Sequence, residues 1–385
     1  MYPMLKPALR RAWRGRNTVQ FGVTPAHAVK LGPVDIPTGS FLELLDGTRG
    51  LPLLYEEARA LDLSERHVDL LLSRLAEAGL LDDPRSAGAG AEALRRRVEV
   101  IDRQRPDEAS LSLVHPEPGG GARRMSARRA TRVQVRGAGR VGASIASLLS
   151  GAGVGLVEVL DGGRAEPWDV APAGLDAAAV GERRDVAARR LVRRSAPGPS
   201  PRTGGTEPVL SLVVVAPRDG LAVYAPSPDT AASWIASGTP HLYAGVIEAT
   251  GVVGPLVLPG GTGCAGCLEL RRADRDPQWP RMLAQWRSGR RGAVAACDLG
   301  LATAVAGLAA AHALAFLDGD LPASTGARWE AALPLLDWRS ERIGPHAECS
   351  CGAPAGLRAR PEQDRTAAEG DRAPGGVPAQ DTMAG

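Results

Sequence analysis

Residues 131–161 read TRVQVRGAGRVGASIASLLSGAGVGLVEVLD, and this stretch decides the fold. Its apolar pattern predicts a strand over TRVQVRG, a helix over RVGASIASLLSGAG and a second strand over LVEVLD. The glycines Gly137, Gly139 and Gly142 stand where the first strand turns into the helix. Together these features predict a βαβ unit that opens with a glycine-rich turn.

The glycine-rich turn is the pattern of a nucleotide-binding site. Gly137 permits the tight turn, Gly139 lets a phosphate approach the backbone, and Gly142 lets the helix pack closely on the strand. The free amides at the helix N-terminus then face an anion. Asp161 ends the second strand, where its carboxylate can accept hydrogen bonds from a ribose. We therefore expect these four residues to bind a nucleotide; a turn that has lost its ligand is the alternative.

The composition limits the classes of protein. A chain of 385 residues is long enough for two domains, and a formal charge of +3 is too small to indicate a nucleic-acid partner. Lys6 and Lys30 are the only lysines, so arginine can stand where other proteins carry lysine. We find neither an uninterrupted apolar run of about 18 residues nor a signal peptide, which predicts a cytoplasmic protein without a membrane span.

The N-terminal part has the pattern of a small α+β module. Residues 18–36 predict two strands, TVQFGV and HAVKLGPVDI, and three helices follow. The first helix is FLELLDG, with Thr38 or Ser40 as its cap, the second is LPLLYEEARAL, and the third opens at Ser64 and stops at Gly79. This order predicts a winged-helix-like module over residues 1–83.

The remaining stretches predict a linker, more α/β structure and a tail. Residues 84–127 are predicted to be a linker, because residues 84–92 and 116–130 are rich in proline, glycine and arginine. Residues 353–385, rich in alanine, glycine and proline, are predicted to be disordered. Between these segments we expect further helices and strands, at residues 182–194 (helix), 209–216, 241–247 and 252–258 (strands) and 298–317 (helix).

Four of the five cysteines form two tight pairs, Cys264-x-x-Cys267 and Cys349-x-Cys351. If the chain folds back on itself, four thiolates satisfy the tetrahedral preference of zinc with no position left for water. This predicts a structural zinc site; His346 is an alternative ligand for one of the sulfurs. The fifth cysteine, Cys297, precedes a predicted helix whose N-terminus would lower the pKa of its thiol, unless it is only a small buried residue.

The order of these features resembles the ThiF-type superfamily of ubiquitin-activating-like adenylyltransferases. The resemblance covers roughly residues 128–352 and is most specific at GPLVLPGGTGCAGCLELRR, since this family places its first CxxC just after such a strand. More narrowly, the chain resembles the actinobacterial branch of bacteriocin-biosynthesis cyclodehydratase partners. Its N-terminal part is similar to PqqD-like domains, which recognise leader peptides. The resemblance implies a Rossmann-like fold, structural zinc, and ATP with magnesium.

The resemblance also identifies catalytic groups that this chain does not match. The family's Asn-Leu-x-Arg stretch supplies an arginine, but Trp168-Asp169-Val170-Ala171-Pro172 contains none. The family's lysine corresponds to Arg184, and its magnesium aspartate to the stretch Ala216-Pro217-Arg218-Asp219, in which Asp219 comes one residue late. Some relatives carry a thioester-forming or sulfur-carrying cysteine, for which Cys297 is the candidate. Arg184, Asp219 and Cys297 are thus the weak catalytic candidates of a degenerate adenylation site.

These observations favour a protein that binds a peptide or protein substrate, and possibly ATP, and presents it to a partner enzyme such as a YcaO-like cyclodehydratase. A strand edge at residues 18–23 or 27–36 would take the extended peptide. An active ATP-dependent carboxylate adenylyltransferase is the first alternative. A winged-helix transcription regulator is the second, weakened by the near-neutral charge of residues 64–79. Relatives of this kind are commonly homodimers.

Overall fold

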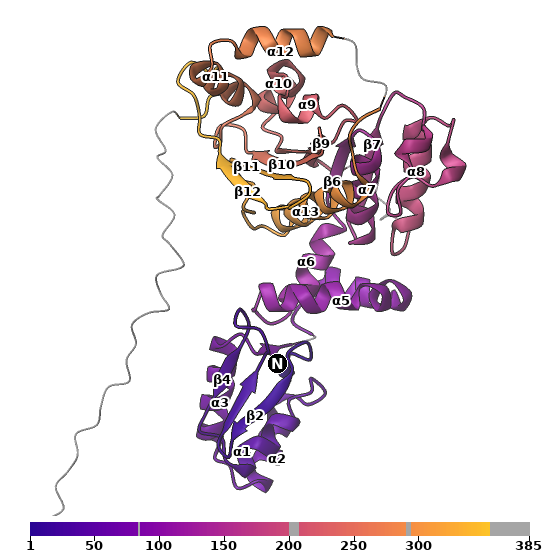
Figure 1. The fold of residues 1–385 in the computed structure, drawn as a ribbon. Coiled ribbons are helices and arrows are strands. Elements are labelled where there is room, and N and C mark those ends of the chain that lie inside the picture. Colours follow the sequence, from indigo (N-terminus) through magenta and orange to yellow (C-terminus); the bar gives the residue numbers. More distant parts are fainter. Residues whose placement is uncertain (84, 200–207, 290–293, 355–385) are drawn as a thin grey trace, which may run out of the picture.

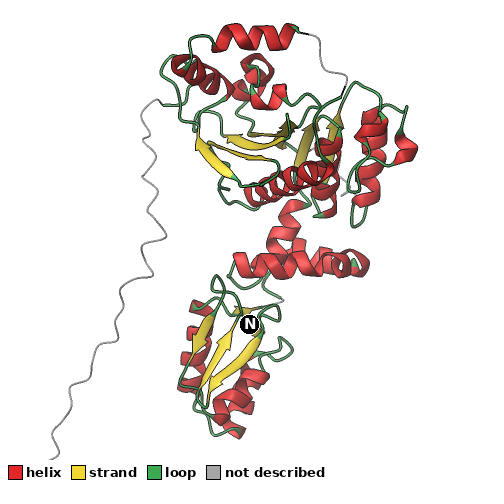
Figure 2. Ribbon diagram, viewed as in Figure 1, coloured by secondary structure: helices red, strands yellow, loops and turns green. Residues whose placement is uncertain are grey.

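The computed structural model describes residues 1–83, 85–199, 208–289 and 294–354. A small N-terminal module and a larger α/β domain are joined by three helices (Figures 1 and 2). Residues 355–385 of the predicted disordered tail lie outside the described part of the chain.

The N-terminal module packs three helices against a three-stranded antiparallel sheet of order β2-β3-β4. Its buried residues include Val19, Phe41, Leu54, Val68 and Leu75, which come from the sheet and all three helices. The elements are β1 (Met4–Leu5), β2 (Arg11–Gly15), β3 (Thr18–Phe21), β4 (Val29–Leu31), α1 (Ile36–Glu43), α2 (Leu51–Ala60), α3 (Glu65–Glu77) and β5 (Leu81–Asp82), which pairs with β1.

Two details of this module differ from the sequence analysis. The cap of α1 is neither Thr38 nor Ser40 but Asp35, whose carboxylate accepts a hydrogen bond from the Thr38 amide at 2.9 Å. The strand at residues 18–23 lies in the middle of its sheet as β3, so both of its edges are already paired. Of the two predicted segments, 27–36, which contains β4, is the one at an edge of the sheet; β2 forms the other edge. As predicted, Ser64 caps the start of α3, and Gly79, with a φ of +68°, follows its C-cap Ala78.

The segment 84–127, which the sequence predicts to be a linker, is mostly helical in its described part. The segment forms α4 (Gly88–Arg95), α5 (Val98–Val114) and α6 (Gly120–Arg128). Apolar side chains from all three helices, among them Leu94, Leu111 and Met125, pack into a core of their own. The buried Lys6 ammonium donates to the carbonyls of Ser112 (2.5 Å) and Pro116 (3.0 Å), which ties the N-terminal module to these helices.

The large domain is built on a seven-stranded sheet of order β12-β11-β10-β9-β8-β6-β7. Strands β7, β6, β8 and β9 are parallel, and β10 to β12 continue the sheet antiparallel. The strands are β6 (Arg132–Arg136), β7 (Leu156–Leu160), β8 (Leu210–Val215), β9 (His241–Ile247), β10 (Thr250–Val257), β11 (Ala327–Ala332) and β12 (Arg339–Arg342). This parallel-rich sheet confirms the predicted α/β fold.

Helices cover both faces of the sheet. One core joins β6 to β10 with α7 (Arg140–Gly151), α8 (Arg184–Ser195) and α13 (Leu299–Leu317). The opposite face carries α9 (Leu221–Tyr224), α10 (Pro228–Ala236), α11 (Ala265–Arg275) and α12 (Trp279–Ser288), as Figure 1 shows. Within the described residues α13 is the one helix long and apolar enough to cross a membrane, and it packs instead against α7 and the sheet.

Candidate nucleotide site and cysteine cluster

The glycine-rich turn between β6 and α7 requires its glycines for lack of space. A Cβ atom on Gly137, whose φ is +113°, would lie 2.1 Å from the Ala216 carbonyl oxygen. A Cβ on Gly142 would lie 2.2 Å from the Gly137 carbonyl oxygen. Because glycine has no side chain, α7 can lie this close to the turn. A Cβ on Gly139 would lie 2.6 Å from Cγ of Arg218. The Arg218 side chain therefore covers the part of the turn at which a phosphate was predicted to approach.

We expect Gly142→Ala to lower the free energy of unfolding by about 2–3 kcal/mol, because the new methyl group meets rigid backbone. Gly307→Ala is the matched control: Gly307 lies inside α13 with no atom within 4 Å of an added Cβ. That change should stabilise the protein by about 0.5–1 kcal/mol. Urea unfolding of both variants measures the difference; equal stabilities would show that α7 does not pack on the turn in this way.

Asp161 lies beside the turn, but its carboxylate is fully engaged. It accepts hydrogen bonds from the backbone amides of Ala138 (2.9 Å) and Gly163 (2.8 Å), and it pairs with Arg184 at 2.8 Å. Burial acts to raise the pKa of Asp161, but the hydrogen bonds from Arg184 and the two amides outweigh it and hold that pKa below its ordinary value. The predicted ribose-binding carboxylate thus already binds an arginine of the same chain.

Arg218 holds two further carboxylates at the same edge of the sheet. Its Nε lies 2.9 Å from the buried Asp169, and its Nη2 pairs with Glu166. Asp169 also accepts from the Glu166 amide at 2.9 Å and lies 3.6 Å from Arg184. Arg184 and Arg218 are thereby linked through one shared carboxylate into a single network with Asp161.

Arg140, the first residue of α7, is the third arginine at this edge. It donates to the Trp168 carbonyl oxygen at 2.6 Å and to the Cys297 carbonyl oxygen at 2.8 Å. Burial raises the pKa of the Cys297 thiol, against a smaller opposing effect of Arg140. This direction is opposite to the lowered pKa predicted from the helix N-terminus, because burial dominates and Asp298, the cap of α13, adds a negative charge.

Asp219 is part of a turn. Its carboxylate accepts a hydrogen bond from the Leu221 amide at 3.0 Å, just before α9. Glu166, Asp169 and Arg218 are site residues that the sequence patterns do not predict. The available signal was Arg218 itself, a cation standing where the family pattern asks for a magnesium-binding carboxylate.

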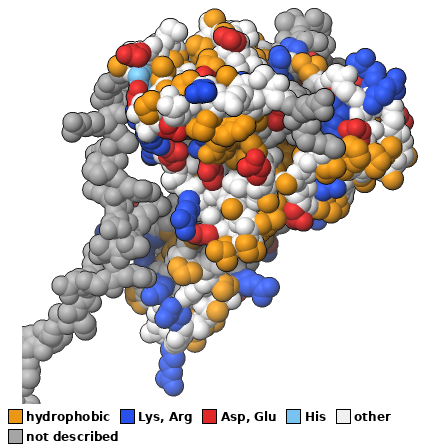
Figure 3. All heavy atoms as spheres, turned by 45° about the horizontal axis from the view of Figure 1, so that its top comes forward, with side chains coloured by type: hydrophobic (Ala, Val, Ile, Leu, Met, Phe, Trp, Pro, Cys, Tyr) orange, Lys and Arg blue, Asp and Glu red, His pale blue; other side chains and the backbone are white. Residues whose placement is uncertain are grey.

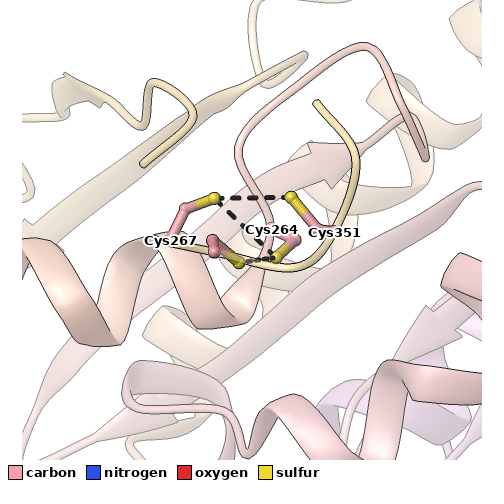
Figure 4. Close-up of side chains that lie close together, drawn as sticks. Cys264, Cys267 and Cys351 are labelled. Carbon is pink, nitrogen blue, oxygen red and sulfur yellow. Dashed lines mark hydrogen bonds between the residues drawn. The ribbon is translucent and has the colours of Figure 1, made fainter. Parts of the chain in front are cut away.

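The four paired cysteines come together as predicted from their spacing, and Figure 4 shows their sulfurs turned toward one another. All four Sγ atoms lie within 4.8 Å of one another; Cys264 is 3.9 Å from Cys267 and 3.6 Å from Cys349, and Cys267 is 3.6 Å from Cys351. Tetrahedral zinc with bonds near 2.3 Å requires sulfurs about 3.8 Å apart. The arrangement therefore fits a four-coordinate metal ion.

The surroundings of the cluster shift the pKa values of its thiols in different directions. Cys264 caps α11 and Cys267 lies in its first turn, where the helix dipole stabilises negative charge. The hydrogen bond from Cys264 lowers the pKa of Cys267, and the same bond raises that of Cys264. Burial raises the pKa of Cys349 to about 11, so metal binding there would release protons. A Cβ on Gly266 would lie 3.0 Å from the Cys349 sulfur, so only glycine leaves this space open.

His346 serves the cluster through its backbone rather than its ring. Its amide donates to the Cys267 sulfur at 3.3 Å, the kind of outer hydrogen bond that orients metal ligands. Its ring nitrogens are engaged elsewhere, one with Asp274 at 2.8 Å and the other with the Glu348 amide at 3.1 Å. The four cysteines are thus the better ligand set.

Comparison with known proteins agrees with this architecture. A family model described as the ThiF family matches residues 116–203, which include the glycine turn, Asp161 and Arg184. This match confirms the resemblance to ThiF-type proteins that the sequence indicates. A comparison of the sequence with curated proteins gives no match.

Solved structures extend the likeness to nearly the whole chain. E. coli MccB with ATP is 16% identical with a TM-score of 0.64, over 92% of this chain and 100% of MccB. A microcin biosynthetic enzyme MccB, in complex with N-formylated MccA, is 15% identical with a TM-score of 0.64, over 92% and 100% of the two chains. PaaA is 15% identical with a TM-score of 0.63, over 89% and 100%. The fold is therefore that of MccB, including the N-terminal part.

Proposed function

We propose that this protein binds a peptide or small protein and presents it to a partner enzyme in the biosynthesis of a modified peptide, with an adenylation site that no longer works. The neighbours support a peptide substrate, since one MccB structure holds N-formylated MccA. We further propose that the protein acts in the cytoplasm as a homodimer, with a YcaO-like cyclodehydratase as the kind of partner. We also propose that residues 1–83 form the peptide-recognition module and residues 128–352 the ThiF-like domain.

The observation that carries the loss of adenylation is the ion-pair network beside the glycine turn. Adenylation needs cations free to take up charge on the phosphates and a carboxylate free to hold magnesium. Here Arg184 is bound to Asp161, and Arg218 is bound to Asp169 and Glu166. Counted with Arg140, which donates to two carbonyls, the three arginines and the three carboxylates of this edge cancel in formal charge. No arginine stands in the stretch 168–172 to replace them.

For the N-terminal module we propose peptide capture at the outer edge of β4. Backbone groups at a sheet edge can pair with an extended peptide, and neighbouring apolar side chains can select among sequences. Val23 and Leu70 are among the exposed apolar side chains of this module. For the cysteine cluster we propose structural zinc, because four thiolates leave no position for a substrate or water.

Pyrophosphate exchange with the purified full-length protein tests the proposal. We expect no ATP-dependent exchange above a protein-free control, with or without candidate precursor peptide, while the same peptide binds and shifts amide signals of Val29–Leu31. Robust exchange would overturn the degenerate site and establish the active adenylyltransferase. A salt-sensitive shift of promoter DNA without peptide binding would instead favour the regulator.

A further inference from the structure

A groove of about 780 Å³ follows the outer edge of β7. It is lined by β7 itself, by one side of α8 and by the segments 153–155 and 196–199. β7 is the last strand of the sheet, and within the described residues no strand pairs with its outer edge. Figure 1 shows α8 beside this end of the sheet. The groove is thus bounded by an unpaired strand edge on one side and a helix on the other.

The hydrogen bonds of β7 identify the backbone groups that point into the groove. The Leu156 amide donates to Thr131, and the Leu160 carbonyl accepts from Gly137. In a parallel pair the residues of a strand alternate between its two sides. Leu156 and Leu160 face β6, so the amides and carbonyls of Val157 and Val159 face away from it. Both residues line the groove.

The charge of the groove is positive. Four arginines and two acids line it, and the acids Glu158 and Asp185 already pair with Arg132 and Arg189. Arg129 and Arg193 have no carboxylate partner among the described residues; Arg129 donates to the Pro199 carbonyl and Arg193 to that of Arg189. Figure 3 shows basic side chains, coloured blue, gathered at the upper right of its view, the side on which Figure 1 places α8.

We propose that this groove binds an extended acidic segment of a partner polypeptide, which adds as a strand beside β7. Its backbone would pair with Val157 and Val159, and its carboxylates would meet Arg129 and Arg193. A peptide fits better than a nucleic acid, because the unpaired edge of β7 offers backbone amides and carbonyls that can pair with a polypeptide strand. The site is separate from the glycine turn and from the β4 edge, so it goes beyond the function proposed above.

Binding of a labelled peptide to the full-length protein tests the charge requirement. The probe is a fluorescein-labelled peptide of about ten residues with alternating valine and glutamate, which places the carboxylates on one side of a strand. We expect Arg129→Glu with Arg193→Glu to weaken its Kd about tenfold or more in fluorescence anisotropy. The matched control is Arg190→Glu on the same helix; Arg190 pairs with Glu182 and does not line the groove, so its Kd should change less than about twofold.

Hydrogen exchange tests the strand itself. The amides of Val157 and Val159 should exchange quickly in the free protein and be protected at least about tenfold when the peptide is bound. The proposal fails if these amides are already protected in the free protein, or stay unprotected in the complex. It also fails if a valine–lysine peptide binds as well, or if a single-stranded oligonucleotide binds more tightly than the acidic peptide.

Discussion

Cys349→Ser combined with Cys351→Ser is expected to release the zinc that we propose for the four-cysteine cluster and to destabilise the large domain. A serine hydroxyl is not deprotonated near neutral pH, so the site loses two of its four anionic ligands. The cluster joins the start of α11 to the last described segment of the chain, which would then lose its anchor. Loss of a structural metal is one of the few changes that cost about 4 kcal/mol or more.

Metal analysis and thermal unfolding measure these effects. The wild-type protein should carry about one zinc per chain, as expected for a single four-cysteine site. Treatment with a chelator should lower its Tm toward that of the double variant. Cys297→Ser is the matched control: Cys297 is not part of the cluster, so its variant should keep its zinc. A fully loaded and equally stable double variant would contradict the site.

The core of the large domain follows from local sequence patterns. The strands β6 to β10 and the helices α7, α8 and α13 all form within a few residues of their predicted positions, because each carries its own apolar periodicity. The cysteine spacing likewise sufficed to predict that the two pairs meet. The strands and helices depend on residues near one another in sequence. The cysteine cluster depends on the preference of metal ions for four thiolate ligands, which the two pairs together supply.

The helices α4 to α6 could not be predicted in this way. The sequences of α4 and α6 are rich in glycine and arginine, and α5 contains Pro106. They are stabilised instead by tertiary contacts, such as the buried bidentate ion pair of Arg128 with Asp318, at 2.8 and 2.6 Å, between the end of α6 and the end of α13. The local sequence around Arg128 cannot predict an ion-pair partner as distant in the chain as Asp318.

In the candidate nucleotide site, too, the parts that depend on local sequence could be predicted and those that depend on distant contacts could not. Gly137, Gly142 and Asp161 could be located from one short stretch, because their roles depend on a single turn. The ion pairs around them join the loop after β7 to the loop after β8, through Asp169 and Arg218. The sequence identified which family groups were missing, but only the fold shows that arginines of this chain occupy the carboxylates that remain.

Asp161→Ala is expected to lower the free energy of unfolding by about 3–5 kcal/mol, because it leaves the largely buried Arg184 without its closest carboxylate. The double variant Asp161→Ala with Arg184→Leu should recover part of this loss, since no unpaired charge then remains. Glu182→Ala is the matched control: it breaks the exposed pair with Arg190 and should cost less than about 1 kcal/mol. Urea unfolding of the wild-type protein, the single variants Asp161→Ala and Arg184→Leu and the double variant gives the interaction energy.

The ion pair of Asp161 with Arg184 also predicts that the stability of the protein depends on pH. The pKa of Asp161 is lowered in the folded state, so its contribution is complete above the ordinary pKa of an aspartate, about 3.9, and is lost as the pH falls through the lower folded value. The wild-type protein should therefore lose stability between about pH 5 and pH 3 more steeply than Asp161→Asn. If the stabilities of the two proteins change with pH in parallel, Arg184 does not hold the Asp161 carboxylate. The argument that Arg184 takes up the carboxylate predicted to bind a ribose would then fail as well.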